Sequence, residues 1–186
     1  MARTKSGTWS HAVEISSLSV ALLFLVELLD HILPVSLDVL GIVPRTPRGL
    51  AGIIFSPLLH SNWAHLMANA FPLFILLIVL FWDRRYYPEQ ALISIWVASG
   101  FGTWLIGRGN AIHIGASSVI YGLVVYLIAA GWWMRSWRAV IVAVLVLVFY
   151  GGIFYGVLPQ RGMVSWEGHL AGALAGWWAA RRNHNQ

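Results

Sequence analysis

The chain has 186 residues, of which 59% are hydrophobic and only 10% are charged, with a mean hydropathy of +0.72. Soluble domains carry about 25% charged residues, so this composition excludes an ordinary soluble domain and indicates a membrane protein with several spans. The absence of cysteine excludes disulfides and thiolate metal sites, and the net charge of +5 does not indicate a nucleic-acid partner, because the basic residues lie in short loops.

Six apolar runs follow one another without an internal repeat, a low-complexity tract or a second domain. They comprise residues 12–34, 64–82, 91–107, 115–134, 138–157 and 167–181. A helix needs about 20 residues to cross the hydrocarbon core, so the first five runs predict spans, and the short sixth is expected to span through local thinning or burial. Continuous hydrophobicity favours helices over a β-barrel. The fold class predicted is an all-α membrane protein with a bundle of six transmembrane helices.

The first run is preceded by Arg3 and Lys5, as a signal peptide is. It also contains Glu14 and Glu27, is long for the apolar part of a signal, and has no small-residue cleavage site before Pro34. We therefore expect a retained helix. The domain limits that follow are a cytoplasmic N-terminal segment 1–11, a six-helix core 12–181 and a cytoplasmic C-terminal tail 182–186.

The basic residues predict the orientation of these spans. With the N-terminus inside, eight Lys and Arg residues fall on the inner side and four on the outer side. The inner residues are Arg3, Lys5, Arg84, Arg85, Arg135, Arg138, Arg181 and Arg182, and the outer residues are Arg45, Arg48, Arg108 and Arg161. Positive charge favours the cytoplasmic side, so both termini are expected there. The compact core and this bias favour a bacterial inner membrane. The longest outer loop, about 35–63, contains an apolar stretch 49–55 that we expect to lie partly in the membrane interface.

Ser117 stands at the start of the fourth run, after the small residues Gly115 and Ala116. A helix start leaves backbone N–H groups unpaired and places the positive end of the helix dipole beside the hydroxyl. These are the components of an oxyanion site next to a nucleophile. The alternative is that Ser117 is only an N-cap, a role that serine fills well.

His169 opens the sixth run, within a stripe of glycines at four-residue spacing. The stripe consists of Gly168, Gly172 and Gly176, and the fourth run offers Ser118 and Gly122 at the same spacing. Close approach of the two helices along these small residues would bring Ser117 and His169 to a similar depth on the outer side. The alternative is a packing stripe beside an interfacial histidine. Glu167 lies roughly 200° around the helix from His169, so a Ser-His dyad is predicted without a carboxylate.

His65 and Asn69 are four residues apart on the second run and share one helix face. Both side chains donate hydrogen bonds, so they are candidates for stabilising an oxyanion, and the alternative is that they join helices. His60 is expected to be structural or interfacial. An intramembrane metalloprotease is the metal-dependent alternative, since His60, His65 and His169 could meet. The chain has no His-Glu-x-x-His motif and no cysteine, and nothing in the sequence demands a metal site, so no metal and no cofactor are predicted.

Together these segments resemble the rhomboid family of intramembrane serine proteases. Three motifs carry the resemblance. They are the spacing of His60, His65 and Asn69 at the second run, Gly115-Ala116-Ser117 at the fourth, and Gly168-His169-Leu170-Ala171-Gly172 at the sixth. The resemblance implies that Ser117 is the nucleophile, His169 the general base, and His65 and Asn69 the oxyanion hole. Gly115, Gly172 and Tyr121 would support the site, Tyr121 by packing against His169.

The resemblance also implies partners: the lipid bilayer and single-span membrane proteins, cleaved near the outer face. Two features depart from the family pattern. Ser118 stands where many relatives have glycine, and the Trp-Arg pair of the first loop is missing, with Pro44-Arg45 as the nearest feature. One competing hypothesis is a catalytically silent rhomboid-like protein that binds membrane clients. A transporter or channel is the other, and the lack of repeats and the clustering of polar groups toward one face argue against it.

Overall fold

The computed structural model describes residues 8–159 and 165–184, and within them the regular structure is helical, without a strand. The α-helices in this part are α1 (Trp9–Ile32), α2 (Pro47–Phe55), α3 (Trp63–Trp82), α4 (Pro88–Ile106), α5 (Ser117–Trp133), α6 (Trp137–Tyr150) and α7 (Trp166–His184). The six long helices correspond to the six predicted apolar runs. Of the basic residues used to predict orientation, Arg3, Lys5 and Arg161 lie outside the described residues.

Two helix ends differ from the prediction. The fifth run was expected to be one helix to residue 157, but α6 ends at Tyr150 and the chain continues as a 3-10 helix, Gly151–Val157. The consecutive Gly151 and Gly152 explain the change, because glycine has a low helix propensity. The sixth run extends further than expected, since α7 continues to His184, beyond the predicted end at residue 181.

Two helices among the described residues are long and apolar enough to cross a membrane on their own, α1 with 24 residues and α3 with 20. Two more, α5 and α6, are apolar but shorter, with 17 and 14 residues. A helix of 14 residues is about 21 Å long, less than the hydrocarbon thickness of about 30 Å. Length and composition therefore identify two spans directly.

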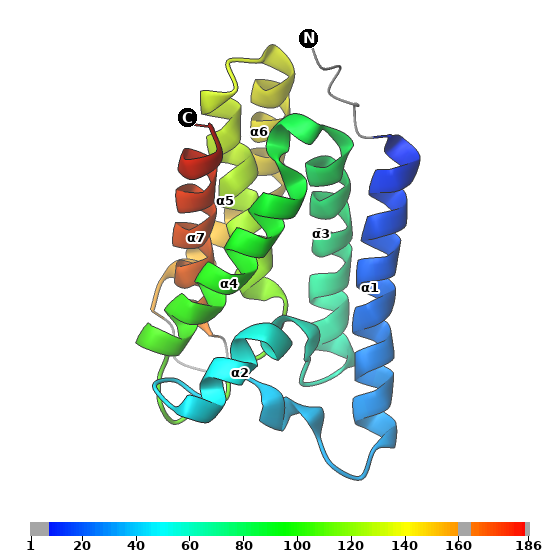
Figure 1. The fold of residues 1–186 in the computed structure, drawn as a ribbon, viewed down its shortest axis with the longest axis vertical. Coiled ribbons are helices and arrows are strands. Elements are labelled where there is room, and N and C mark those ends of the chain that lie inside the picture. Colours follow the sequence, from blue (N-terminus) through cyan, green and yellow to red (C-terminus); the bar gives the residue numbers. More distant parts are fainter. Residues whose placement is uncertain (1–7, 160–164, 185–186) are drawn as a thin grey trace.

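The helices form two neighbouring groups (Figure 1). Helix α1 packs along α3, while α7 packs between α4 and α5, and α6 packs on α5. Helix α1 begins and α7 ends at the same end of the molecule, and the short α2 lies at the opposite end. Since α5 and α7 both begin at that opposite end, the residues at their N-termini lie at a similar level.

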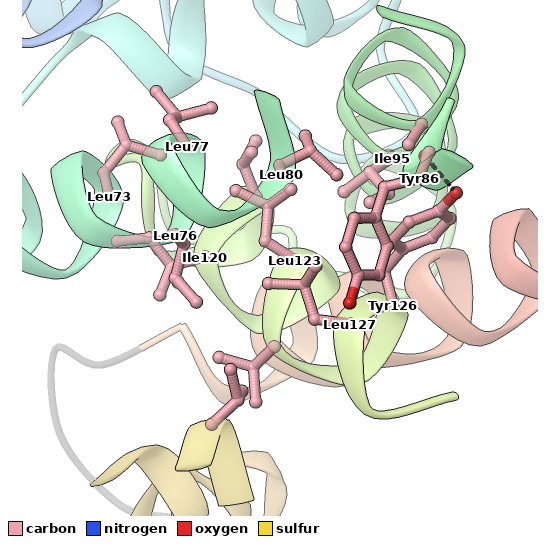
Figure 2. Packing of buried hydrophobic residues seen from close by; sticks show 14 of the residues in the cluster. Leu73, Leu76, Leu77, Leu80, Tyr86, Ile95, Ile120, Leu123, Tyr126 and Leu127 are labelled. Carbon is pink, nitrogen blue, oxygen red and sulfur yellow. Dashed lines mark hydrogen bonds between the residues drawn. The ribbon is translucent and has the colours of Figure 1, made fainter. Parts of the chain in front are cut away.

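The apolar core joins the two groups through α3 and α5 (Figure 2). The buried side chains of these helices that meet there include Leu73, Leu76, Leu77, Leu80, Ile120, Leu123 and Leu127. At the edge of this cluster the hydroxyl of Tyr126 donates a hydrogen bond to the carbonyl of Tyr86 at 2.5 Å. This bond joins α5 to the turn between α3 and α4, and thereby satisfies a hydroxyl that is fully buried.

The long loop between α1 and α3 is attached to α4 by side-chain hydrogen bonds. The guanidinium of Arg45 donates to the carbonyls of Leu105 and Gly107, at 3.0 and 2.8 Å. The indole of Trp104 donates to the carbonyl of Thr46 at 2.8 Å. Arg45 and Trp104 therefore attach this loop to α4. Unlike the Trp-Arg pair that is missing from the loop, these two residues are not adjacent in sequence. The stretch expected at the membrane interface forms α2, which leaves Ile54 63% exposed.

Candidate active site

Ser117 is the first residue of α5, and the backbone before it makes a turn that requires glycine. Gly115 has φ of +110°, a conformation that residues with a side chain rarely adopt. A Cβ atom at Gly115 would lie 2.8 Å from the imidazole of His65. The N-cap is Ala116, which makes no side-chain capping bond, so Ser117 is not the N-cap that the alternative interpretation required.

His169 reaches Ser117 because α5 and α7 are in backbone contact. A Cβ at Gly172 would lie 2.0 Å from the carbonyl oxygen of Ser118, and one at Gly176 would lie 2.0 Å from the carbonyl oxygen of Gly122. Only glycine permits this approach. At the end of the contact, Nε2 of His169 lies 3.0 Å from Oγ of Ser117.

The backbone carbonyl of Gly156 determines which nitrogen of His169 carries the proton. It lies 3.0 Å from Nδ1 of His169, and a carbonyl only accepts, so Nδ1 is the protonated nitrogen. Nε2 is then free to accept the hydroxyl proton of Ser117. The Tyr121 ring stacks on the imidazole with a centroid distance of 4.0 Å and an interplanar angle of 11°.

Candidate hydrogen-bond donors for an oxyanion lie at the start of α5 and on α3. The first intrahelical bond of α5 runs from Ile120 N–H to the carbonyl of Ala116, so the N–H of Ser117 has no partner within the helix. Nδ1 of His65 lies 3.4 Å from the N–H of Ser61 and accepts from it, which leaves the proton of His65 on Nε2. Nε2 of His65 faces Gly115. Asn69 lies one turn further along α3 and is buried, with its amide donating to the carbonyl of His65 at 2.9 Å.

His60 supports the turn before Ser117. It is 2% exposed, its ring meets His65 edge-on at 5.0 Å, and its Nε2 lies 3.5 Å from the N–H of Ala116. Burial, together with the neighbouring His65, lowers the pKa of His60 to about 4. The ring is therefore neutral at pH 7 and available as an acceptor, in line with the structural role expected for it.

A small pocket opens beside Ser117, with polar groups from five segments around it. Its lining residues are Ile42, Ser56, Thr103, His113, Ile114, Gly115, Ser117, Ser118, Ser165 and Gly168. Hydroxyls and an imidazole suit this pocket for a water molecule. It adjoins the oxygen that would act as a nucleophile.

Glu167 and the possibility of a metal site were also considered in the sequence analysis. The carboxylate of Glu167 lies 3.3 Å from Nε of Arg108, so it faces away from His169, as its position on the helix predicted. Within the described ranges no three His, Asp or Glu side chains are grouped to hold a metal ion. The sequence did not reveal the contact of Gly156 with His169, because the interacting atom of Gly156 is its backbone carbonyl oxygen. A Cβ there would lie 1.7 Å from the Tyr121 hydroxyl and 3.2 Å from Nδ1 of His169.

Comparison with known proteins identifies relatives of this chain. It is 47% identical over 167 residues to an uncharacterized protein of Mycobacterium tuberculosis, an alignment that covers 84% of this chain and 69% of that protein. An uncharacterized protein of Mycobacterium leprae is 42% identical, over 84% of this chain and 65% of the relative. The chloroplastic Rhomboid-like protein 11 of Arabidopsis thaliana is 26% identical, over 63% of this chain and 46% of the plant protein. No solved structure matches the chain.

The family comparison covers most of the chain. The model of the rhomboid domain matches residues 47–185, a region that contains α2 to α7 and every residue of the candidate site. Together with the two apolar spans, this match makes the protein an integral membrane protein. Because the match covers more than half of the chain, the chain belongs to the rhomboid family.

Proposed function

We propose that this protein is an intramembrane serine endopeptidase that cleaves single-span membrane proteins near the outer face of a bacterial inner membrane. All six long helices would cross the bilayer, with both termini in the cytoplasm. The observation that supports this proposal most strongly is the 3.0 Å contact between Oγ of Ser117 and Nε2 of His169, with Nδ1 held by Gly156. A histidine in this tautomer is the base that a serine nucleophile requires.

In the proposed reaction, Oγ of Ser117 attacks the scissile carbonyl while its proton passes to Nε2 of His169. The carbonyl of Gly156 then stabilises the imidazolium by accepting from Nδ1–H, the part that a carboxylate plays in a triad. His169 returns the proton to the leaving amine, and the acyl-enzyme is hydrolysed by water that enters through the pocket beside Ser117.

The negative charge of the tetrahedral intermediate needs donors that are in place before the reaction. The Ser117 N–H, Nε2–H of His65 and the amide of Asn69 would provide them. Gly115 supports this arrangement through its positive φ, Gly172 through the α5–α7 contact, and Tyr121 by stacking on His169. The proposal thus gives each of these residues one physical role.

The experiment that tests the proposal is cleavage of a model single-span protein in liposomes, with small residues near the outer end of its span. Wild type should cleave it, whereas Ser117→Ala and His169→Ala should not. Ser16→Ala is the matched control, since it removes another buried hydroxyl, bonded to the carbonyl of Ala12 in α1. Folded wild-type protein that cleaves no substrate of this class would instead favour the alternative, a rhomboid-like protein that binds membrane clients without cutting them.

A further inference from the structure

His113 lies outside the dyad, and its imidazole joins two segments that the proposed reaction needs to hold together. It is 4% exposed and sits in the loop between α4 and α5, four residues before Ser117. Its backbone N–H and carbonyl form a pair of 2.9 Å hydrogen bonds with Ile42. Its Nδ1 lies 2.6 Å from Oγ of Ser165, the residue just before α7.

The direction of each hydrogen bond follows from its acceptors. Nε2 of His113 lies 3.2 Å from the carbonyl of Arg108, so Nε2 carries the proton and Nδ1 is bare. The hydroxyl of Ser165 must then donate to Nδ1. The same oxygen accepts from the N–H of Gly168 at 3.3 Å, an N-cap bond of α7. Every polar atom in this chain of bonds has a partner only while His113 is neutral.

The chain of bonds connects the two catalytic candidates by short paths. The N–H of His169 donates to the carbonyl of Ser165 at 3.1 Å, so His169 is one helical turn from the residue that His113 holds. On the other side, four residues of backbone connect His113 to Ser117. From this geometry we infer that His113 and Ser165 are positioning residues, a latch that holds the start of α7 against the nucleophile segment. The inference rests on the proposed function.

Protonation of His113 would reverse this bond, because both ring nitrogens would then donate: Nδ1–H would donate to Oγ of Ser165, and the hydroxyl proton of Ser165 would lose its acceptor. The charged groups that face the imidazole are Arg108, Arg45 and Glu167. Burial lowers the pKa of His113 below its ordinary 6.5, the carbonyl of Arg108 and Glu167 oppose this shift, and the two arginines add to it. The imidazole is therefore neutral at pH 7, and the Ser165 hydroxyl donates to it.

The test measures the rate at which a fluorophosphonate labels the full-length protein in detergent. Ser165→Ala and His113→Phe should each label roughly tenfold or more slowly, because a small misplacement of a base is costly. The double variant should be no slower than either single variant, and Ser165→Thr should restore the rate, because it keeps the hydroxyl. Ser36→Ala is the control, since it also removes an N-cap bond, at Asp38 N–H, but outside the site.

A second measurement separates this inference from the proposed function. Hydrogen exchange should become faster in Ser165→Ala at the start of α7 and in the segment 113–117 together, but not in Ser36→Ala. Wild-type protein that the fluorophosphonate does not label would contradict the proposed function. Hydrogen exchange in Ser165→Ala would still show whether His113 and Ser165 hold the two segments together. Labelling or exchange in Ser165→Ala equal to that of wild type overturns the latch, as does a double variant whose loss is the product of the two single losses.

Discussion

The carbonyl oxygen of Gly156 lies 3.0 Å from Nδ1 of His169, and a side chain at position 156 would collide with the ring that covers this histidine. Gly156 therefore has two roles in the geometry of the site. Its carbonyl selects the tautomer of His169, and its missing side chain leaves room for Tyr121 to stack on the imidazole. In the proposed mechanism, a backbone atom thus takes the place that a carboxylate has in a catalytic triad.

Gly156→Ala should reduce the rate of fluorophosphonate labelling by roughly 10²-fold, because a displaced base loses its alignment with the nucleophile. The new methyl would lie 1.7 Å from the Tyr121 hydroxyl, so the stacked ring must move. Gly152→Ala, four residues earlier, is the matched control, since a Cβ there meets nothing within 4 Å. Equal labelling rates in the two variants would show that the contacts of Gly156 with Tyr121 and His169 do not affect the reactivity of Ser117.

The contact between α5 and α7 should be equally intolerant of a methyl group. In Gly176→Ala the Cβ would lie 2.0 Å from the carbonyl of Gly122, so the helices must separate. We expect the free energy of unfolding to fall by about 1–3 kcal/mol, the usual cost of overpacking, despite the better helix propensity of alanine. Gly151→Ala, where the nearest atom would be at 3.7 Å, should not destabilise the protein. Thermal unfolding in detergent measures both, and a Gly176→Ala variant as stable as wild type would contradict the backbone contact.

Removing the side-chain amide of Asn69 should weaken catalysis without abolishing it. Loss of one oxyanion donor costs about 10²-fold in rate, so Asn69→Ala should retain measurable cleavage that Ser117→Ala lacks. The measurement is cleavage of the single-span substrate in liposomes, together with thermal unfolding to confirm that the variant is folded. A loss as complete as that in Ser117→Ala would assign Asn69 a structural role, through its bond to the carbonyl of His65.

His60 should make the fold sensitive to mild acid. Its pKa is about 4 in the folded protein and about 6.5 when unfolded, so the unfolded chain binds the proton first. The contribution of His60 to stability is complete above pH 6.5 and is lost as the pH falls from about 6.5 to about 4. The unfolding temperature of wild type should drop more steeply through this window than that of His60→Gln, which retains an acceptor for the Ala116 N–H. Parallel curves for the two proteins would contradict this assignment.

The sequence was sufficient to predict the helical class and the order of the long helices. Continuous apolar runs separated by proline, glycine and charged residues predict helices in a membrane protein. The sequence was also sufficient to bring α5 and α7 together, since small residues at four-residue spacing are visible in both. The end of α6 was predicted wrongly, because hydrophobicity continues through Gly151 and Gly152 while the helix does not.

The supporting contacts of the site were beyond reach of the sequence for a different reason. Gly156 acts through its carbonyl, which every residue possesses, so no residue type marks it. The pairing of His113 with Ser165 joins positions 52 residues apart, and neither belongs to a motif. Gly156 itself was the one available signal, because glycine permits a close approach, whereas Gly151 and Gly152 make no such approach.

We expect Ser117 to be a nucleophile that His169 activates. The most direct measurement is fluorophosphonate labelling of the purified protein, with the adduct located by mass spectrometry, in wild type, Ser117→Ala, His169→Ala and the control Ser16→Ala. We expect an adduct on Ser117 in wild type and in the control, and none in the other two variants. Labelling that persists in Ser117→Ala, or folded wild-type protein that takes up no probe, would contradict it.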